Sequence, residues 1–311
     1  MSIRTFQPGD ESAQMSIYNQ AASVLPGVKL ATLDEIRRRT TADDFDPETR
    51  LYAIENDHPV AYATYQTNGR ISYPWCLPGA EKWREPLLEA VLTRTRQRGL
   101  RQVFVAYQED WQPIRDLFLE HDFVQSREML NYVLELTDVP TSAMGTIQAI
   151  TPFEKSDLPA LLKMASEVSD ASEGVIEESW IRNRYFSSDC LFVLRNRTTK
   201  EPEAFGVLVQ NPDYADVRQL NARMPCFRLG AFGTEGMSVK RINGLFSFLV
   251  RDPKLVSPMG LDLLAYANSQ LQDEELEALA AQVPSDVPHL ASFYRQYFSL
   301  QGKFPVFTKA L

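Results

Sequence analysis

The first half of the chain alternates between two spacings of apolar residues. Spacings of three and four residues are typical of helices, and short runs of β-branched and aromatic residues are typical of strands. The predicted helices cover residues 11–18, 33–39, 82–98 and 113–120. The predicted strands cover residues 3–6, 51–54, 59–65, 71–73, 103–107 and 132–136.

Two of these helices carry recognisable end signals. Thr32 is placed to cap the second helix, because its hydroxyl can accept a hydrogen bond from the first turn. The third helix begins near Lys82 and is expected to end at Gly99. Its apolar spacing predicts one buried face, which consists of Leu87, Leu88, Val91, Leu92 and Thr95.

The second half of the chain repeats the order of the first. Residues 147–154 resemble residues 3–10, each an extended apolar run followed by a proline and an acid, at an offset of roughly 144 residues. The strand pair 191–194 and 203–209 answers the pair in the first half. The remaining predictions are helices over 158–168, 177–185, 244–250, 273–281 and 289–297, and strands over 226–232, 261–266 and 306–308.

This repetition predicts two tandem domains. Residues 137–145 contain a proline, a glycine and several small residues, which is typical of a linker, so the predicted domains are 1–138 and 146–311. Strands and helices alternate in each half without a strict βαβ order. The pattern therefore indicates the α/β class, with a mixed sheet and helices on both of its faces.

Composition and charge narrow the functional classes. The chain has 311 residues, of which 44% are apolar and 23% charged, so it is expected to bury two sizeable cores. Its net charge of -9 argues against a nucleic-acid partner. No apolar run approaches the ~20 residues that cross a membrane, and no secretory signal is visible, so a cytoplasmic location is expected.

Cysteine and histidine side chains give no sign of a metal site. Cys76, Cys190 and Cys226 lie far apart and outside any CxxC pair, so they are expected to be reduced thiols. The three histidines show no spacing typical of metal ligands. No bound metal is therefore expected.

A candidate phosphate-binding loop follows the predicted strand 226–232. The segment Arg241-Ile242-Asn243-Gly244-Leu245-Phe246 fits the pattern [Gln/Arg]-x-x-Gly-x-[Gly/Ala] except at Phe246, and an aliphatic pair follows it. A loop of this kind turns backbone N–H groups and a helix start toward one anion. With the order of elements around it, this segment resembles the coenzyme loop of the GNAT superfamily of acyl-CoA-dependent N-acyltransferases.

The resemblance implies that acetyl-CoA is the co-substrate and that the second domain binds it. The residues that it assigns to coenzyme binding are Gly236, Met237, Arg241, Ile242, Asn243, Gly244, Leu245 and Asn268. Asn268 enters as the asparagine at the end of the fifth strand, for which an exposed turn is an equal alternative. The backbone N–H groups near Gly236 and Met237 would polarise the thioester carbonyl.

The first half departs from the family pattern at both of its key positions. Gly79, Lys82 and Arg84 occupy the three defined loop positions, and the two long cationic side chains would fill the space that the phosphates need. Phe118 occupies the place of the tyrosine that often protonates the leaving thiolate. A phenylalanine cannot donate a proton, so the first domain is expected to be degenerate.

Two residues of the second half are assigned to catalysis by the same resemblance. Glu235 lies where a carboxylate accepts the amine proton in several GNAT enzymes, although a solvated acid in a glycine-rich turn is an alternative. The tyrosine position falls on Phe293 or Tyr294, depending on the alignment of the last helix. Tyr294 is chosen as the candidate general acid, with a surface tyrosine as the alternative.

The resulting prediction is an N-acetyltransferase whose second domain acetylates an amine of a small molecule or peptide. One alternative is a non-catalytic binding or scaffolding protein that has kept the fold. An aminoacyl or peptide transferase is a second alternative, which the acidic charge disfavours. Oligomeric state does not follow from the sequence.

Overall fold

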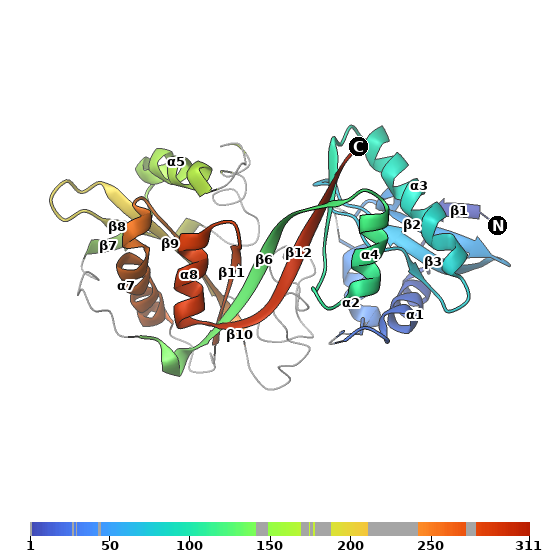
Figure 1. The fold of residues 1–311 in the computed structure, drawn as a ribbon, viewed down its shortest axis with the longest axis horizontal. Helices are drawn as coiled ribbons and strands as arrows, with labels where there is room; N and C mark the ends of the chain where they lie inside the picture. The colour runs from blue at the N-terminus through green and yellow to red at the C-terminus, as the bar shows by residue number, and fades with distance from the viewer. Residues whose placement is uncertain are drawn as a thin grey trace. The chain divides into compact units, whose positions relative to one another are not determined.

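The chain folds into two compact units that are not contiguous in sequence (Figure 1). A computed structural model describes residues 2–26, 28, 30–42, 45–140, 149–168, 174, 177, 188–210, 242–271 and 278–311. Of these residues, those up to Glu128 and those from Lys303 onward form the N-terminal unit. The other described residues form the C-terminal unit. The boundary between the units therefore falls inside the two long strands 124–135 and 299–310, whereas the sequence predicts one boundary at the linker 137–145.

The N-terminal unit is built around an antiparallel sheet of order β1-β2-β3-β4. Strand β5 of this unit pairs antiparallel with the last residues of β12. The strands are β1 (Ser2–Thr5), β2 (Arg50–Glu55), β3 (His58–Thr64), β4 (Trp75–Cys76), β5 (Gln102–Ala106), the start of β6 (Val124–Glu135) and the end of β12 (Ser299–Ala310). The helices are α1 (Glu11–Ala22), α2 (Leu33–Thr40), α3 (Arg84–Gln97) and α4 (Gln112–Glu120).

Local sequence signals account for the helices of this unit. Thr32 accepts a hydrogen bond from the backbone N–H of Glu35, whose carboxylate accepts from Thr32 in return, so the predicted cap is confirmed as a capping box. Helix α3 buries the five residues that its spacing predicts. Gly99 ends it in the left-handed conformation, with φ +77°.

The C-terminal unit has a mixed sheet of order β6-β11-β10-β9-β8-β7, in which only the neighbouring strands β10 and β11 are parallel. Its strands are β7 (Ile150–Pro152), β8 (Leu191–Arg195), β9 (Pro202–Gln210), β10 (Ile242–Val250), β11 (Ala278–Pro284) and the remaining parts of β6 and β12. Its helices are α5 (Leu158–Val168), α7 (Val256–Gln270) and α8 (Pro288–Tyr297). Helices α7 and α8 lie side by side (Figure 1).

Three predicted elements of the second half are wrong. Residues 244–250 form strand β10, residues 261–266 lie within helix α7, and residues 278–281 of the predicted acidic helix begin strand β11. In β10 alternate aromatic residues suit a strand, whereas the loop motif had suggested a helix. The alanines and leucine of β11 favour a helix locally, but pairing with β6 on one side and β10 on the other overrides this preference. The predicted helix 177–185, apart from Glu177, and the strand 226–232 lie outside the described residues.

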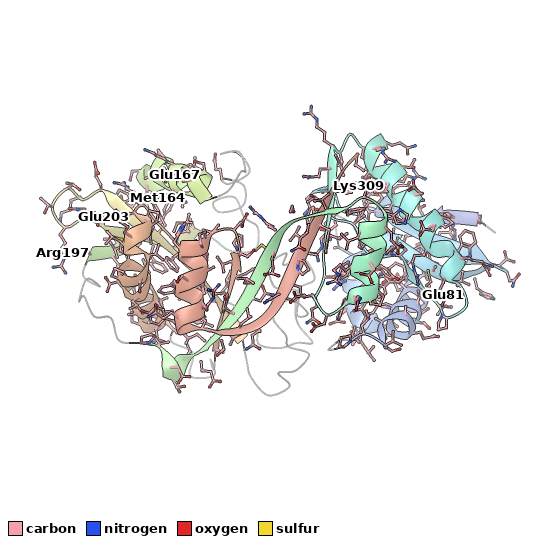
Figure 2. All side chains as sticks on the ribbon, in the orientation of Figure 1. Glu81, Met164, Glu167, Arg197, Glu203 and Lys309 are labelled. Carbon is pink, nitrogen blue, oxygen red and sulfur yellow. The ribbon has the colours of Figure 1, made fainter. Side chains whose placement is uncertain are left out.

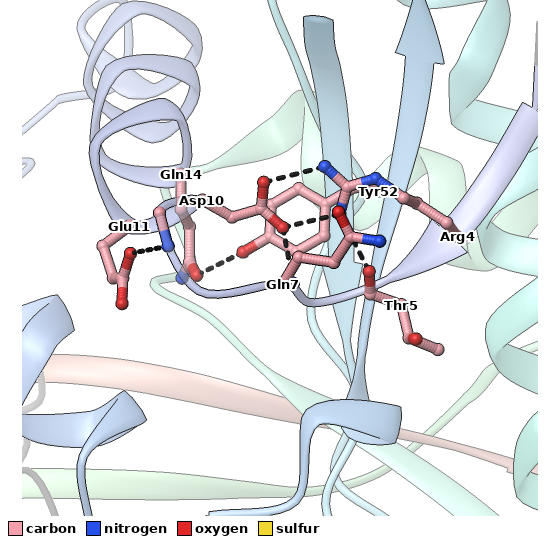
Figure 3. A network of polar contacts seen from close by, with 8 residues as sticks. Arg4, Thr5, Gln7, Asp10, Glu11, Gln14 and Tyr52 are labelled. Atoms are coloured by element: carbon pink, nitrogen blue, oxygen red, sulfur yellow. Dashed lines mark hydrogen bonds and ion pairs between the residues drawn. The ribbon is translucent and has the colours of Figure 1, made fainter. Parts of the chain in front are cut away.

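The internal repeat is visible as one arginine–aspartate arrangement at the start of each unit, and Figure 3 shows it in the N-terminal unit. Arg4 holds Asp10 through two hydrogen bonds of 2.6 and 2.8 Å, and the backbone N–H of Gln7 also donates to Asp10. In the C-terminal unit Arg195 holds Asp157 through bonds of 2.8 and 2.7 Å, and Glu154 takes the place of Gln7. Residues 3–10 are therefore equivalent to residues 150–157.

Candidate functional site

The parallel strands of the C-terminal unit separate partway along their length. Strand β10 pairs with β11 only from Ile242 to Leu245, with a register irregularity before Gly244. Beyond this point β10 pairs with β9 and β11 pairs with β6. Past Leu245, the edges of β10 and β11 that face each other therefore have backbone N–H and C=O groups that do not pair between the two strands. An extended ligand could bind to these groups.

The N-terminal unit contains the same divergence. The segment before β4 meets β5 through a parallel bridge between Arg70 and Phe104. Gly69 allows this close approach, because its φ is +88° and a Cβ there would lie 2.7 Å from the carbonyl oxygen of Gln102. Strand β4 then pairs with β3, and β5 pairs with β12. Both units therefore share one sheet design.

Tyr294 lies beside the divergence of the C-terminal unit. It is on α8 and only 1% exposed, with its ring 5.7 Å from that of Phe248 on β10. The hydroxyl oxygen is buried without a hydrogen bond of ordinary geometry. Burial raises the pKa of Tyr294. The side chain of Ser247, which lies two residues past the last residue of β10 that pairs with β11, lowers this pKa and so partly offsets the effect of burial. A buried hydroxyl of this kind is unusual and invites a functional explanation.

Burial in the last helices indicates which residue is equivalent to Phe118. Helix α4 buries Ile114, Leu117 and Phe118. Helix α8 buries Leu290, Ala291, Phe293 and Tyr294. Leu290, Phe293 and Tyr294 are spaced as Ile114, Leu117 and Phe118 are. Superposing the two patterns places Tyr294, and not Phe293, at the position of Phe118.

The predicted coenzyme loop is not at the turn between strand and helix. Ile242, Asn243, Gly244 and Leu245 begin strand β10, while Arg241, Glu235, Gly236 and Met237 lie outside the described residues. Residues 251–255 instead connect β10 to α7, so Arg251 takes the first position of the motif and Lys254 takes the glycine position. Sequence reasoning missed this turn because it lacks glycine. The available signal was Arg251, a cationic residue next to Asp252 and Pro253, which begin the turn.

A carboxylate already occupies this turn. The side chain of Asp252 accepts a hydrogen bond of 3.0 Å from the backbone N–H of Lys254. In the N-terminal unit the side chain of Glu81, labelled in Figure 2 before α3, accepts one of 3.1 Å from Gly79. Hydrogen bonds from the backbone N–H groups of Glu81 itself and of Gly79 lower the pKa of Glu81. A phosphate at either turn would compete with these carboxylates.

The cations of the N-terminal turn are also engaged. Lys82 pairs with Glu55 at 2.7 Å, and the guanidinium of Arg84 lies 5.5 Å from the ring centre of Tyr73. Gly79 has φ +87° and open space around it. Neither charge is therefore free to receive a phosphate without losing a partner, and the degenerate loop stays a prediction.

Asn268 is not at the end of a strand. It lies in the last turn of α7, half-buried, and its carbonyl accepts the N–H of Leu271. The strand that runs parallel to β10 ends at Pro284, so Ser285 and Asp286 hold the position predicted for Asn268. Asn268 is separated from the β10–α7 turn by most of the helix, roughly 18 Å at 1.5 Å per residue.

Comparison with solved structures identifies the fold. The chain matches a GCN5-related N-acetyltransferase from Sphaerobacter thermophilus with a TM-score of 0.63 at 14% identity, covering 99% of this chain and 95% of that one. It matches a GNAT-family acetyltransferase from Colwellia psychrerythraea with a TM-score of 0.52 at 12% identity, over 100% of both chains. No family model and no curated protein matches in sequence. The chain thus has the GNAT acetyltransferase fold, and the predicted fold class is confirmed.

No helix in the described part of the chain combines the length and the apolar character that a membrane span needs. No group of three or more His, Cys, Asp or Glu side chains in this part could hold a metal ion.

Proposed function

We propose that the chain is an N-acyltransferase whose C-terminal unit moves the acetyl group of acetyl-CoA to an amine of a small molecule or peptide. The observation that carries this proposal is the buried hydroxyl of Tyr294 beside the point where β10 and β11 separate. The GNAT fold of the chain supports the same reaction class.

In the proposed reaction the neutral amine attacks the thioester carbonyl carbon. A C–N bond forms, the C–S bond breaks, and the amine proton passes to a base. Glu235, outside the described residues, is the candidate base. Tyr294 gives its proton to the leaving sulfur and recovers one from solvent, while Glu235 releases the amine proton to solvent, so both side chains return to their starting states. Tyr294 is protonated at neutral pH, and the burial that raises its pKa also makes it a weaker acid than an exposed tyrosine.

The phosphate end of acetyl-CoA requires a local change. Arg251 and Lys254 supply positive charge at the β10–α7 turn, but Arg251 already pairs with Glu201 at 3.4 Å and the Asp252 carboxylate accepts a hydrogen bond from the backbone N–H of Lys254. Binding there would release this carboxylate. The predicted coenzyme residues Ile242 to Leu245 begin β10 at the end opposite this turn, so the proposal assigns the phosphates to the turn and not to them. Gly236, Met237 and Arg241 lie outside the described residues.

A non-catalytic binding protein is the second candidate. The observation that favours it is the carboxylate at both helix starts, Glu81 in one unit and Asp252 in the other. A protein that had lost coenzyme binding would tolerate acids at these turns, because no phosphate would be repelled.

Calorimetric titration with acetyl-CoA separates the candidates. Binding to the wild type with a dissociation constant below about 1 mM supports the enzyme, and no binding at this level refutes it. Tyr294→Phe should retain binding but lower kcat with an amine acceptor by about 10-fold or more. Tyr297→Phe, on the same helix, is the matched control and should leave kcat within about 2-fold. Asp252→Asn should tighten binding if its carboxylate competes with phosphate.

A further inference from the structure

Three arginines of the N-terminal unit come from neighbouring segments and have no carboxylate partner among the residues that the structure describes. Arg39 is in the last turn of α2, Arg50 begins β2, and Arg70 precedes β4. The Nε atoms of Arg39 and Arg50 are buried and make no hydrogen bond. Arg50 donates to Gln14 at 3.0 Å, whereas no hydrogen bond or ion pair of the Arg39 or Arg70 side chain is found in the structure's described part.

The register of the strands places these side chains near one another. Arg50 is directly opposite Thr64, the last residue of β3. The backbone N–H of Thr64 bonds to the hydroxyl of Ser72, two residues after Arg70. Arg39 approaches from α2, which is joined to α1 by the hydrogen bond from Thr40 to Glu11. The three guanidinium groups thus come from three segments that meet at one end of the sheet.

Their charges interact and are poorly hydrated. Burial lowers the pKa of Arg50 and that of Arg70, and the positive charge of Arg39 lowers both further. Guanidinium groups nevertheless stay protonated in proteins. Partly buried like charges with no counterion among the described residues are costly, so their presence needs an explanation.

One carboxylate lies near this cluster and does not neutralise it. Glu11 acts electrostatically on Arg50, but its oxygens accept from the backbone N–H of Gly9 at 2.8 Å and from the hydroxyl of Thr40 at 3.3 Å. Asp10 is already held by Arg4 (Figure 3). With Glu11 counted against one guanidinium, two positive charges have no carboxylate partner within the described part of the chain.

The second unit shows that the fold does not require these polar groups. The equivalence of residues 3–10 and 150–157 makes Leu161 the counterpart of Gln14. Phe6 and Phe153 each donate a backbone hydrogen bond to the neighbouring strand, at Arg50 and Leu191 respectively, so Leu191 is the counterpart of Arg50. Both leucines are at most 1% exposed. The same place in this fold can therefore be filled by an apolar core.

We propose that Arg39, Arg50 and Arg70 form a binding site for a small dianionic oxyanion of the phosphate type. Planar guanidinium groups suit phosphate oxygens in geometry and charge. A dianion would compensate the two remaining charges and accept hydrogen bonds from the free N–H groups. The site belongs to the N-terminal unit and does not depend on the proposed acyl transfer.

Calorimetric titration with inorganic phosphate tests the site. The wild type should bind phosphate more tightly than acetate, because acetate carries one charge. The double variant Arg39→Gln, Arg70→Gln should lose at least about 10-fold in phosphate affinity. Arg96→Gln, an exposed residue of α3, is the control and should change it by less than about 2-fold. Equal affinity of wild type and double variant, or no phosphate binding, would overturn the proposal.

A stability measurement distinguishes a ligand site from a structural cluster. Without phosphate, the double variant should unfold at the same temperature as the wild type or at a higher one, since buried repulsion is removed. With saturating phosphate only the wild type should be stabilised. A lower unfolding temperature without phosphate would mean that the arginines hold the fold, and would refute the proposal. Acetyl-CoA affinity should be the same in both proteins.

Discussion

The Arg195–Asp157 pair offers a direct test of how the repeat is held together. The Asp157 side chain is 4% exposed and that of Arg195 18%, and two bonds of 2.8 and 2.7 Å join them. Replacing Arg195 by Ile leaves a buried carboxylate with a backbone N–H but no cation. The expected loss in the free energy of unfolding is about 3 to 5 kcal/mol, the range for a buried ion pair that loses one partner.

The N-terminal unit indicates how this loss can be repaired. There the arginine comes from the first strand, as Arg4, and Ile54 stands at the position of Arg195. The two positions are equivalent because a register irregularity falls directly before each of them. Thr151 is the counterpart of Arg4. The double variant Thr151→Arg, Arg195→Ile therefore copies the N-terminal arrangement into the C-terminal unit, and should recover at least about 2 kcal/mol of the loss.

Urea unfolding followed by circular dichroism measures the total change, and hydrogen exchange of the α5 amides reports the C-terminal unit separately. Arg197→Ile, on the loop after β8, is the control for an exposed arginine. The reasoning is refuted if Arg195→Ile costs less than about 1 kcal/mol, or if the double variant is no more stable than the single one.

Three further outcomes follow from local contacts. Gly206→Ala should destabilise the C-terminal unit by about 1 to 3 kcal/mol in thermal unfolding, because the new Cβ meets the ring of Phe192; an unchanged midpoint would contradict this packing. Burial raises the pKa of Cys76 to about 11, so at pH 8 its thiol should react with disulfide reagents far more slowly in the native protein than in urea. The native rate should rise toward pH 11, and equal rates in native and unfolded protein would exclude a protected thiol. Thr32→Ala should cost about 1 kcal/mol, measured by urea unfolding, through loss of the α2 cap, and Thr32→Ser should retain most of it.

The N-terminal unit was largely predictable from sequence because its elements are marked locally. Helix α3 shows a clear apolar face, and Thr32 and Gly99 mark helix ends. In the C-terminal unit the strand β11 depends on its neighbours, since its own residues prefer a helix. Local patterns contain no information about such pairing, and this is where the predictions fail.

The candidate site was predictable only in part for a related reason. A motif with one glycine was assigned to a turn, but Gly244 lies in a strand and the actual turn contains Arg251 and Lys254. Helix periodicity fixes a side chain to within one residue, and the spacing of the buried residues favours Tyr294 over Phe293 as the equivalent of Phe118, while its catalytic role stays a prediction. The arginine cluster of the N-terminal unit escaped notice because its members are far apart in sequence and meet only through the sheet.

At one pair of equivalent positions the polar side chain is in the C-terminal unit, and at another pair it is in the N-terminal unit. This difference bears on both proposals. Where the C-terminal unit has the hydroxyl of Tyr294, the N-terminal unit has Phe118, and both side chains are buried. Where the N-terminal unit has Arg50, the C-terminal unit has Leu191. If one of the two repeated units had simply lost its function, polar groups would be replaced by apolar ones in that unit only. Polar groups at different places in each unit are the outcome expected if both proposals hold, with chemistry at one sheet and anion binding at the other.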